Sequence, residues 1–217
     1  MVRLKIAVLI SGRGSNMRSL VETCSTTGGP AEIVMVLSNV ADAAGLKFAK
    51  NAGIPTMTID HRNFPDRETF EQKITACLID AGVELVCLAG FMRLLTASFV
   101  NTWRDRLVNI HPSLLPAYKG LHTHARVIAD GARFTGCTVH FVRPEMDTGP
   151  IIVQAAVPVA FDDDADNLAR RVLDAEHQIY PLALRLIAEG RVTIENDLVR
   201  IEGAQTPMSS VVNPGLG

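Results

Sequence analysis

The feature that most constrains this chain is a run rich in Val, Ile and Leu, Val2 to Ile10, which ends in the loop Ser11-Gly12-Arg13-Gly14-Ser15-Asn16. A run with almost no polar alternation is typical of a strand buried on both faces, as in parallel sheets. Apolar residues at helical spacing follow, and Gly28-Gly29-Pro30 ends that segment before a second strand-like run, Glu32 to Leu37. This order predicts a strand-loop-helix-strand unit.

The alternation of strand-like and helix-like segments continues along the chain. Helices are expected at about Asp42 to Asn51, Asp66 to Asp80, Ala97 to Arg104 and Asp164 to Ala188. Further strands are expected at Pro55 to Ile59, Leu85 to Ala89, Leu107 to Ile110, Thr138 to Val142 and Ile151 to Pro158. Such alternation predicts an α/β fold with a doubly wound, mostly parallel sheet and a Rossmann-like N-terminal half.

The chain has 217 residues, 47% hydrophobic and 20% charged, which is the profile of a globular protein. We expect one domain over residues 1–202, divided near residue 100 into a phosphate-binding and a catalytic half. Residues 203–217 combine Gly, Pro, Ser, Gln and Asn with little apolar periodicity, which predicts a disordered tail.

Charge and cysteine usage narrow the class of protein. Twenty-one basic and 23 acidic residues give a net charge of -2 without a Lys/Arg block, which argues against a nucleic-acid partner. No stretch approaches the ~20 apolar residues that span a bilayer, and the N-terminal run is too short for a signal peptide. Four dispersed cysteines without a CxxC pair indicate reduced, packed thiols. A cytoplasmic location is expected.

The glycine-rich loop predicts an anion site. Free backbone N–H groups and the helix dipole converge where a strand passes into a helix. Met17 stands where the dinucleotide fingerprint needs a third small residue, and Leu37-Ser38-Asn39 lacks the expected acidic residue. The loop therefore indicates a monophosphate cradle formed by Gly14, Ser15 and Asn16. The alternative is a tight turn that binds nothing.

A second group of polar residues, Asn109, His111 and Asp147, is suited to catalysis. In Asn109-Ile110-His111-Pro112, strand alternation places Asn109 and His111 on one face, at the carboxyl edge where open α/β sheets bind ligands. An imidazole beside a carboxamide suits stabilisation of an oxyanion at an acyl centre. Asp147, in Asp147-Thr148-Gly149-Pro150, is the candidate carboxylate that favours the imidazolium form. We expect Asp147 and His111 to lie in a solvent-accessible crevice rather than in the core. Alternatively, His111 is structural and the Asp147 segment is only a turn.

A zinc site for hydrolysis is a weaker alternative. It would use imidazoles of His111, His122, His124 and His140 with Asp147. No pair of these histidines has the i, i+4 helical spacing of zinc proteases, and no cysteine pair supports a structural site.

Five segments follow one another in order across residues 4 to about 200. Together they form a pattern that is highly specific for one protein family. They are Ile10 to Asn16, Leu88 to Arg93, Asn109 to Pro116, Gly120 to His124 and Asp147 to Pro150. The chain resembles the folate-dependent formyltransferases that act on glycinamide ribonucleotide in purine biosynthesis. The Asn109/His111 motif is also similar to methionyl-tRNA formyltransferases and formyltetrahydrofolate deformylases, which carry an extra domain for which we expect no room here.

The resemblance implies a set of roles. Asn109, His111 and Asp147 form the catalytic set, Gly14, Ser15 and Asn16 bind the substrate phosphate, and Glu176 binds its ribose. Glu176 also has a plainer interpretation as part of a solvated helix face. The implied folate-binding residues are Arg67, Met92, Arg93, Leu94, Leu95 and Asn109, with an apolar pterin slot near Leu88, Leu107 and Val142.

The resemblance also implies which molecules the chain binds. The donor is 10-formyltetrahydrofolate, the acceptor is glycinamide ribonucleotide, and no metal or redox cofactor is expected. A monomer or a homodimer is consistent with this family. The competing class, a nucleotide-binding module without catalysis, would leave Asn109, His111 and Asp147 without a joint purpose. The fine specificity set by Arg13 and by Ala117 to Lys119 does not follow from the sequence.

Overall fold

The computed structural model describes residues 3–26 and 28–215. Its strands are β1 (Leu4–Ile10), β2 (Ala31–Ser38), β3 (Thr56–Thr58), β4 (Leu85–Leu88), β5 (Leu107–His111), β6 (Phe134–Phe141), β7 (Ile151–Pro158), β8 (Val192–Glu195) and β9 (Leu198–Ile201). Its helices are α1 (Ser15–Ser25), α2 (Ala44–Asn51), α3 (Arg67–Asp80), α4 (Ala97–Thr102), α5 (Thr123–Ala129) and α6 (Ala165–Ala188), with a 3-10 turn, η1 (His61–Asn63).

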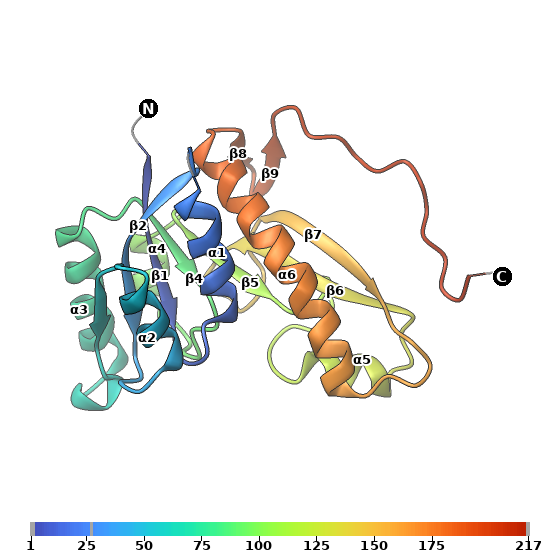
Figure 1. The fold of residues 1–217 in the computed structure, drawn as a ribbon, viewed down its shortest axis with the longest axis horizontal. Helices are drawn as coiled ribbons and strands as arrows, with labels where there is room; N and C mark the ends of the chain where they lie inside the picture. The colour runs from blue at the N-terminus through green and yellow to red at the C-terminus, as the bar shows by residue number, and fades with distance from the viewer. Residues whose placement is uncertain (1–2, 27, 216–217) are drawn as a thin grey trace.

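Seven strands form one twisted sheet in the order β3-β2-β1-β4-β5-β6-β7 (Figure 1). The first five are parallel, whereas β6 and β7 continue the sheet antiparallel. The predicted doubly wound, mostly parallel α/β fold is therefore confirmed. The strand order reverses between β1 and β4, and the loops after these two strands are joined there by a 3.0 Å hydrogen bond from the Ser11 N–H to the Gly90 carbonyl.

Helices cover both faces of this sheet and create two apolar cores. On one face Met17 and Leu20 of α1 pack with Leu168 and Tyr180 of α6 in a cluster that reaches β7. On the other face α3 and α4 pack against β1, β4 and β5 around the fully buried Trp103. Because β1 is covered on both sides, its apolar residues need no polar alternation, and Ile6 to Ile10 are completely buried.

Three parts of the fold differ from the sequence expectations. Helix α5 was not predicted, because its seven residues are too few to show helical periodicity. The β8–β9 hairpin was not predicted either, because its short strands are mostly exposed and its turn uses Asn196 and Asp197 in the left-handed region. Strand β6 also begins at Phe134, four residues earlier than expected.

All four cysteines are free and buried, as predicted. Residues 203–215 of the expected tail have no helix or strand, although the Asn213 side chain donates hydrogen bonds to the carbonyls of Arg133 and Val159. The predicted first strand includes Val2, and the predicted tail includes Leu216 and Gly217. These three residues lie outside the described residues. The single domain and its division near residue 100 stay predictions.

Candidate active site

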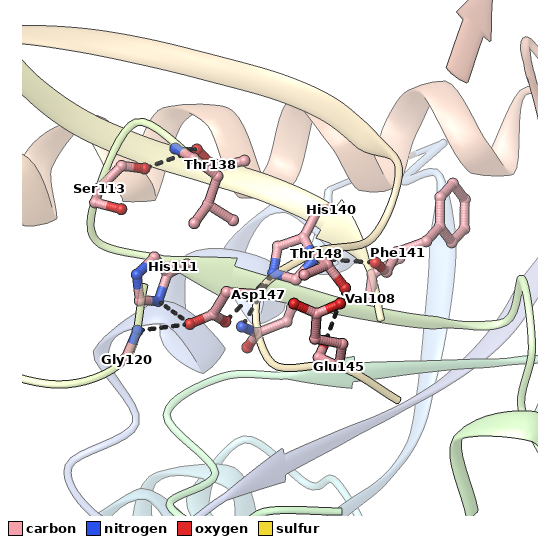
Figure 2. A network of polar contacts seen from close by, with 12 residues as sticks. Val108, His111, Ser113, Gly120, Thr138, His140, Phe141, Glu145, Asp147 and Thr148 are labelled. Carbon is pink, nitrogen blue, oxygen red and sulfur yellow. Dashed lines mark hydrogen bonds and ion pairs between the residues drawn. The ribbon is translucent and has the colours of Figure 1, made fainter. Parts of the chain in front are cut away.

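Strand β5 and the β6–β7 connection bring the three predicted catalytic side chains together. His111 ends β5, and Asn109 precedes it on the same face. Strand β6 runs antiparallel to β5 and places His140 directly opposite Asn109. The chain then turns back towards β7, and Asp147 lies in this turn between His111 and His140 (Figure 2).

The Asp147 carboxylate lies between His111, Gly120 and His140. Its Oδ2 atom is 3.5 Å from His111 Nδ1 and accepts a 2.8 Å hydrogen bond from the Gly120 backbone N–H. Its Oδ1 atom is 3.9 Å from His140 Nε2. The side chains of His111 and Asp147 are only 7% and 10% exposed, so the expectation that both lie in a solvent-accessible crevice is wrong.

Both ring nitrogens of His111 face acceptors. Nδ1 faces Asp147, and Nε2–H donates a 3.0 Å hydrogen bond to the Tyr118 carbonyl oxygen. Contacts at both ring nitrogens therefore hold the imidazole in one orientation beside Asp147.

His140 is part of this site, although the sequence interpretation named it only for zinc. Its Nδ1–H donates to the Phe141 carbonyl at 2.9 Å, and burial lowers its pKa, so the ring is neutral. The Nε2 lone pair then accepts from Asn109 Nδ2 at 3.4 Å, near the long limit for such a bond. This contact fixes which end of the Asn109 carboxamide is the donor.

Strained backbone holds the cluster. Asp147, Tyr118 and His122 all have positive φ, between 53° and 56°. A Cβ on Gly149 would lie 1.6 Å from the Phe141 carbonyl oxygen, so only glycine permits the close approach that returns the chain to β7. Such strain persists only where surrounding contacts over-determine the conformation, and it is common at functional sites.

The glycine-rich loop enters α1 as the sequence predicted. Gly14, with φ of 71°, is the N-cap, and no side chain caps the first amides of α1. A Cβ on Gly14 would also lie 2.9 Å from Met17 Cε and 3.1 Å from the Gly45 backbone. A cavity of about 490 Å³ opens beside this helix start, lined by Arg13, Ser15, Arg18, Ser19, Glu22, Thr23, Ala44 and His177. The free amides and two arginines make this end of α1 suitable for an anion.

Glu176 of α6 lies beside this loop and is not on a solvated face. It is 6% exposed, and its Oε2 accepts a 2.7 Å hydrogen bond from Asn16 Nδ2. Burial raises the Glu176 pKa to about 7, against the opposing effect of the Asn16 bond. The plainer interpretation of Glu176 is therefore wrong.

The residues implied for folate fall into two groups. Leu88, Leu107 and Val142 meet in the apolar cluster under α3 and α4, where Leu88 and Leu107 are buried. Met92 and Leu94 are about two-thirds exposed on the segment after β4, with Arg93 and Leu95 partly buried between them. Arg67 is exposed at the first position of α3, which begins at the carboxyl edge of the sheet. A 2.8 Å bond from the Met92 N–H to Ser11 Oγ joins the segment after β4 to the glycine-rich loop.

Comparison with known proteins assigns the chain to a family. Residues 4–184 match the family model described as formyl transferase. The chain belongs to the formyl transferase family. Phosphoribosylglycinamide formyltransferase of Escherichia coli is 42% identical over 204 residues, which cover 94% of this chain and 96% of that protein. The crystal structure of glycinamide ribonucleotide transformylase 1 from Symbiobacterium toebii has a TM-score of 0.89 at 45% identity, covering 92% and 94% of the two chains.

Some formyl transferase relatives are much longer. The trifunctional purine biosynthetic protein adenosine-3 of Gallus gallus is 48% identical over 192 residues, which are 88% of this chain. This formyl transferase spans 19% of that relative's length. The similarity therefore concerns one part of a longer protein.

Two structural features bear on other classes of function. Across residues 3–26 and 28–215, no group of three or more His, Cys, Asp or Glu side chains is arranged to hold a metal ion. His122 is exposed and His124 is half-buried in α5, and neither joins the His111–Asp147 contact. In the same residues, no helix has the length and apolarity needed to cross a membrane.

Proposed function

We propose that this chain transfers the formyl group of 10-formyltetrahydrofolate to the amine of glycinamide ribonucleotide, in purine biosynthesis. The observation that carries the proposal is the buried His111–Asp147 contact beside Asn109, which is equipment for acyl transfer. The names of the E. coli and S. toebii relatives, which match nearly end to end, support the choice of acceptor.

In this proposal the ribonucleotide lies along the carboxyl edge of the sheet. Its phosphate accepts hydrogen bonds from the amides of Gly14, Ser15 and Asn16 at the start of α1, and Glu176 accepts from the ribose hydroxyls. The folate lies against the segment Met92 to Leu95, with its pterin near Leu88, Leu107 and Val142. Arg67 pairs with a folate carboxylate.

The chemistry is addition followed by elimination at the formyl carbon. The amine nitrogen attacks that carbon, a new C–N bond forms, and the carbonyl electron pair moves onto oxygen. Asn109 Nδ2–H and His111 Nε2–H donate to this oxyanion. The bond to the folate nitrogen then breaks, and the proton lost by the amine passes by way of Asp147 to the leaving nitrogen. Asp147 also balances the charge of the imidazolium.

The hydrogen bond between His111 and Tyr118 sets one requirement for this mechanism. The Nε2–H of His111 donates to the Tyr118 carbonyl, so the substrate oxygen must replace Tyr118 as the acceptor. Tyr118 lies in the left-handed region within a half-buried loop. A small movement of Ala117 to Lys119 would free the donor, which gives this segment a role in substrate binding.

Two other functions are tested by one experiment. A deformylase would use water as the acceptor, and a binding module would not react. Purified chain is incubated with 10-formyltetrahydrofolate and either glycinamide ribonucleotide, methionyl-tRNA or water alone, and tetrahydrofolate release is followed by absorbance. We expect release that requires the ribonucleotide. Release with water alone would indicate a deformylase, and no release in any arm would indicate a module.

The remaining expectations accompany this function. The free cysteines and the absence of a CxxC pair support a reducing, cytoplasmic location. A monomer or homodimer with small-molecule partners, and no nucleic acid, membrane or metal, is proposed with it.

A further inference from the structure

The side chain of Asn16 makes a long-range polar contact that phosphate binding does not need. Asn16 belongs to the first turn of α1, whereas Glu176 lies 160 residues later in α6. The 2.7 Å bond between Asn16 Nδ2 and Glu176 Oε2 is buried, and Asn16 itself is 9% exposed. Asn16 Oδ1 is buried without a hydrogen-bond partner among the described residues, so the side chain acts here as a donor only.

The surroundings of Glu176 make that donor important. Besides Asn16, burial is the influence that acts on the Glu176 pKa, and it opposes the charged form. The titratable groups that respond to Glu176 are Cys137 from β6 and Tyr180 from the next turn of α6. The pKa of Cys137 is raised to about 12 and that of Tyr180 lies well above its ordinary value, so both stay neutral. Neither can balance a negative charge on Glu176.

We propose that Asn16 is a positioning residue for the ribose, because its side-chain amide holds Glu176 as an oriented carboxylate while its backbone N–H binds the phosphate. The inference rests on the proposed function and adds a residue to it. One residue of α1 thereby links recognition of the two parts of the ribonucleotide. A hydrogen bond to an ionised partner contributes about 1.5–3 kcal/mol in general, equivalent to roughly tenfold or more in an equilibrium constant.

The proposal predicts the direction in which KM for the ribonucleotide changes with pH. Ribose hydroxyls donate to the ionised carboxylate, so KM for the ribonucleotide should fall as the pH rises through about 7, the pKa of Glu176. Removal of the Asn16 donor destabilises the ionised form, which raises this pKa further. The midpoint of the KM profile should then move to higher pH. The shift is about one pH unit if loss of the Asn16 bond disfavours the ionised form of Glu176 tenfold.

The test measures KM for the ribonucleotide and for the folate from pH 6 to 9 in the wild type, Asn16→Ala and Asn16→Asp. Both variants keep the backbone N–H, and Asp keeps the size of Asn. We expect Asn16→Ala to raise the ribonucleotide KM about tenfold at pH 7 and much less at pH 9, with kcat and the folate KM unchanged. Asn16→Asp should shift the midpoint further, because two carboxylates then face each other. An unshifted midpoint in both variants would overturn the proposal.

Two controls separate positioning from general damage. Ser19→Ala removes the neighbouring buried hydrogen bond, from Ser19 Oγ to the Asn16 carbonyl, and should leave the pH midpoint unchanged. In a Glu176→Gln background, Asn16→Ala should add little, because the carboxylate it serves is absent. Equal additional losses in that background would contradict the proposal. A wild-type chain that transfers no formyl group to the ribonucleotide would refute the proposed function instead, which separates the two outcomes.

Discussion

The two ends of the site are built in different ways. The start of α1 presents backbone N–H groups and a helix dipole, and the loop is shaped by Gly14. Around β5 and β6 the site presents side chains instead, because His111, Asp147, His140 and Asn109 are joined in one largely buried polar network. The first region is relaxed helical geometry, whereas the second contains three residues with positive φ.

This difference corresponds to two roles, substrate binding in the first region and catalysis in the second, under the proposed function. Backbone amides hold a phosphate equally in the ground state and the transition state, so they lower KM. Side chains that donate or transfer protons interact with charge that develops only in the transition state, so they raise kcat. Substitutions in the first region should therefore change binding, and those in the second should change turnover.

The sharpest test of the second region concerns the His111–Asp147 pair. His111→Ala and Asp147→Asn should each lower kcat by roughly 10²- to 10⁴-fold, the range for general acid–base groups. The double variant should lose little more than the worse single variant, because either change already disables the shared function. Steady-state kinetics on the three variants measures this coupling.

The burial of both side chains makes a stability control necessary. Circular dichroism and thermal melts must show that the variants are folded at the assay temperature. Fully additive losses in the activation free energy, or near-normal turnover of His111→Ala, would rule out the coupled pair.

The next effect concerns the backbone of the catalytic turn. Gly149→Ala places a Cβ against the Phe141 carbonyl and should destabilise the fold by about 1–3 kcal/mol, as overpacking does. For a domain of this size the melting temperature should fall by about 2–4 °C per kcal/mol. The matched variant in the first region is Gly12→Ala, whose Cβ meets no atom within 4 Å and should leave the melting temperature unchanged. Equal melting temperatures for the two variants would show that the Gly149 turn is no more tightly packed than the loop at Gly12.

A smaller effect is expected in the phosphate loop. Ser15→Ala keeps the amides of α1 and removes one hydroxyl donor, so KM for the ribonucleotide should rise about tenfold while kcat changes little. The folate KM is the internal reference. A loss confined to kcat would show that the loop takes part in the chemistry.

The smallest effect is expected at Arg67, which is exposed at the start of α3. An exposed ion pair contributes about 0–1 kcal/mol, so Arg67→Ala should weaken folate binding only about two- to fivefold and spare the ribonucleotide. Isothermal titration with each ligand compares the two. Equal weakening of both would argue against a folate carboxylate as its partner.

The parallel half of the fold could be predicted because its strands are buried on both faces. Such strands read as apolar runs, and each is followed by a helix with its own stop signal, such as Gly28-Gly29-Pro30. The β8–β9 hairpin and α5 could not be predicted, because short and partly exposed elements leave no periodic pattern.

The candidate catalytic residues could be predicted only by residue type and by their position at strand ends. Alternation placed Asn109 with His111, but the register that sets His140 opposite Asn109 depends on antiparallel pairing, which a sequence does not specify. The bond between Asn16 and Glu176 joins helices far apart in the chain, so neither residue signals the other. The contact between His111 and Asp147 likewise depends on how the β6–β7 turn folds back.

The continuous sheet has a consequence for the size of molecule that the site accepts. The glycine-rich loop follows β1 and His111 ends β5, with β4 between them. Neighbouring strands lie about 4.8 Å apart, so these ends are separated by about 10 Å across the sheet. Tyr180 of α6 donates to the carbonyls of Leu88 and Val108, which ties β4, β5 and the long helix into one frame. With the phosphate at the loop, as proposed, this fixed spacing would keep the nitrogen of a shorter phosphorylated amine out of reach of His111.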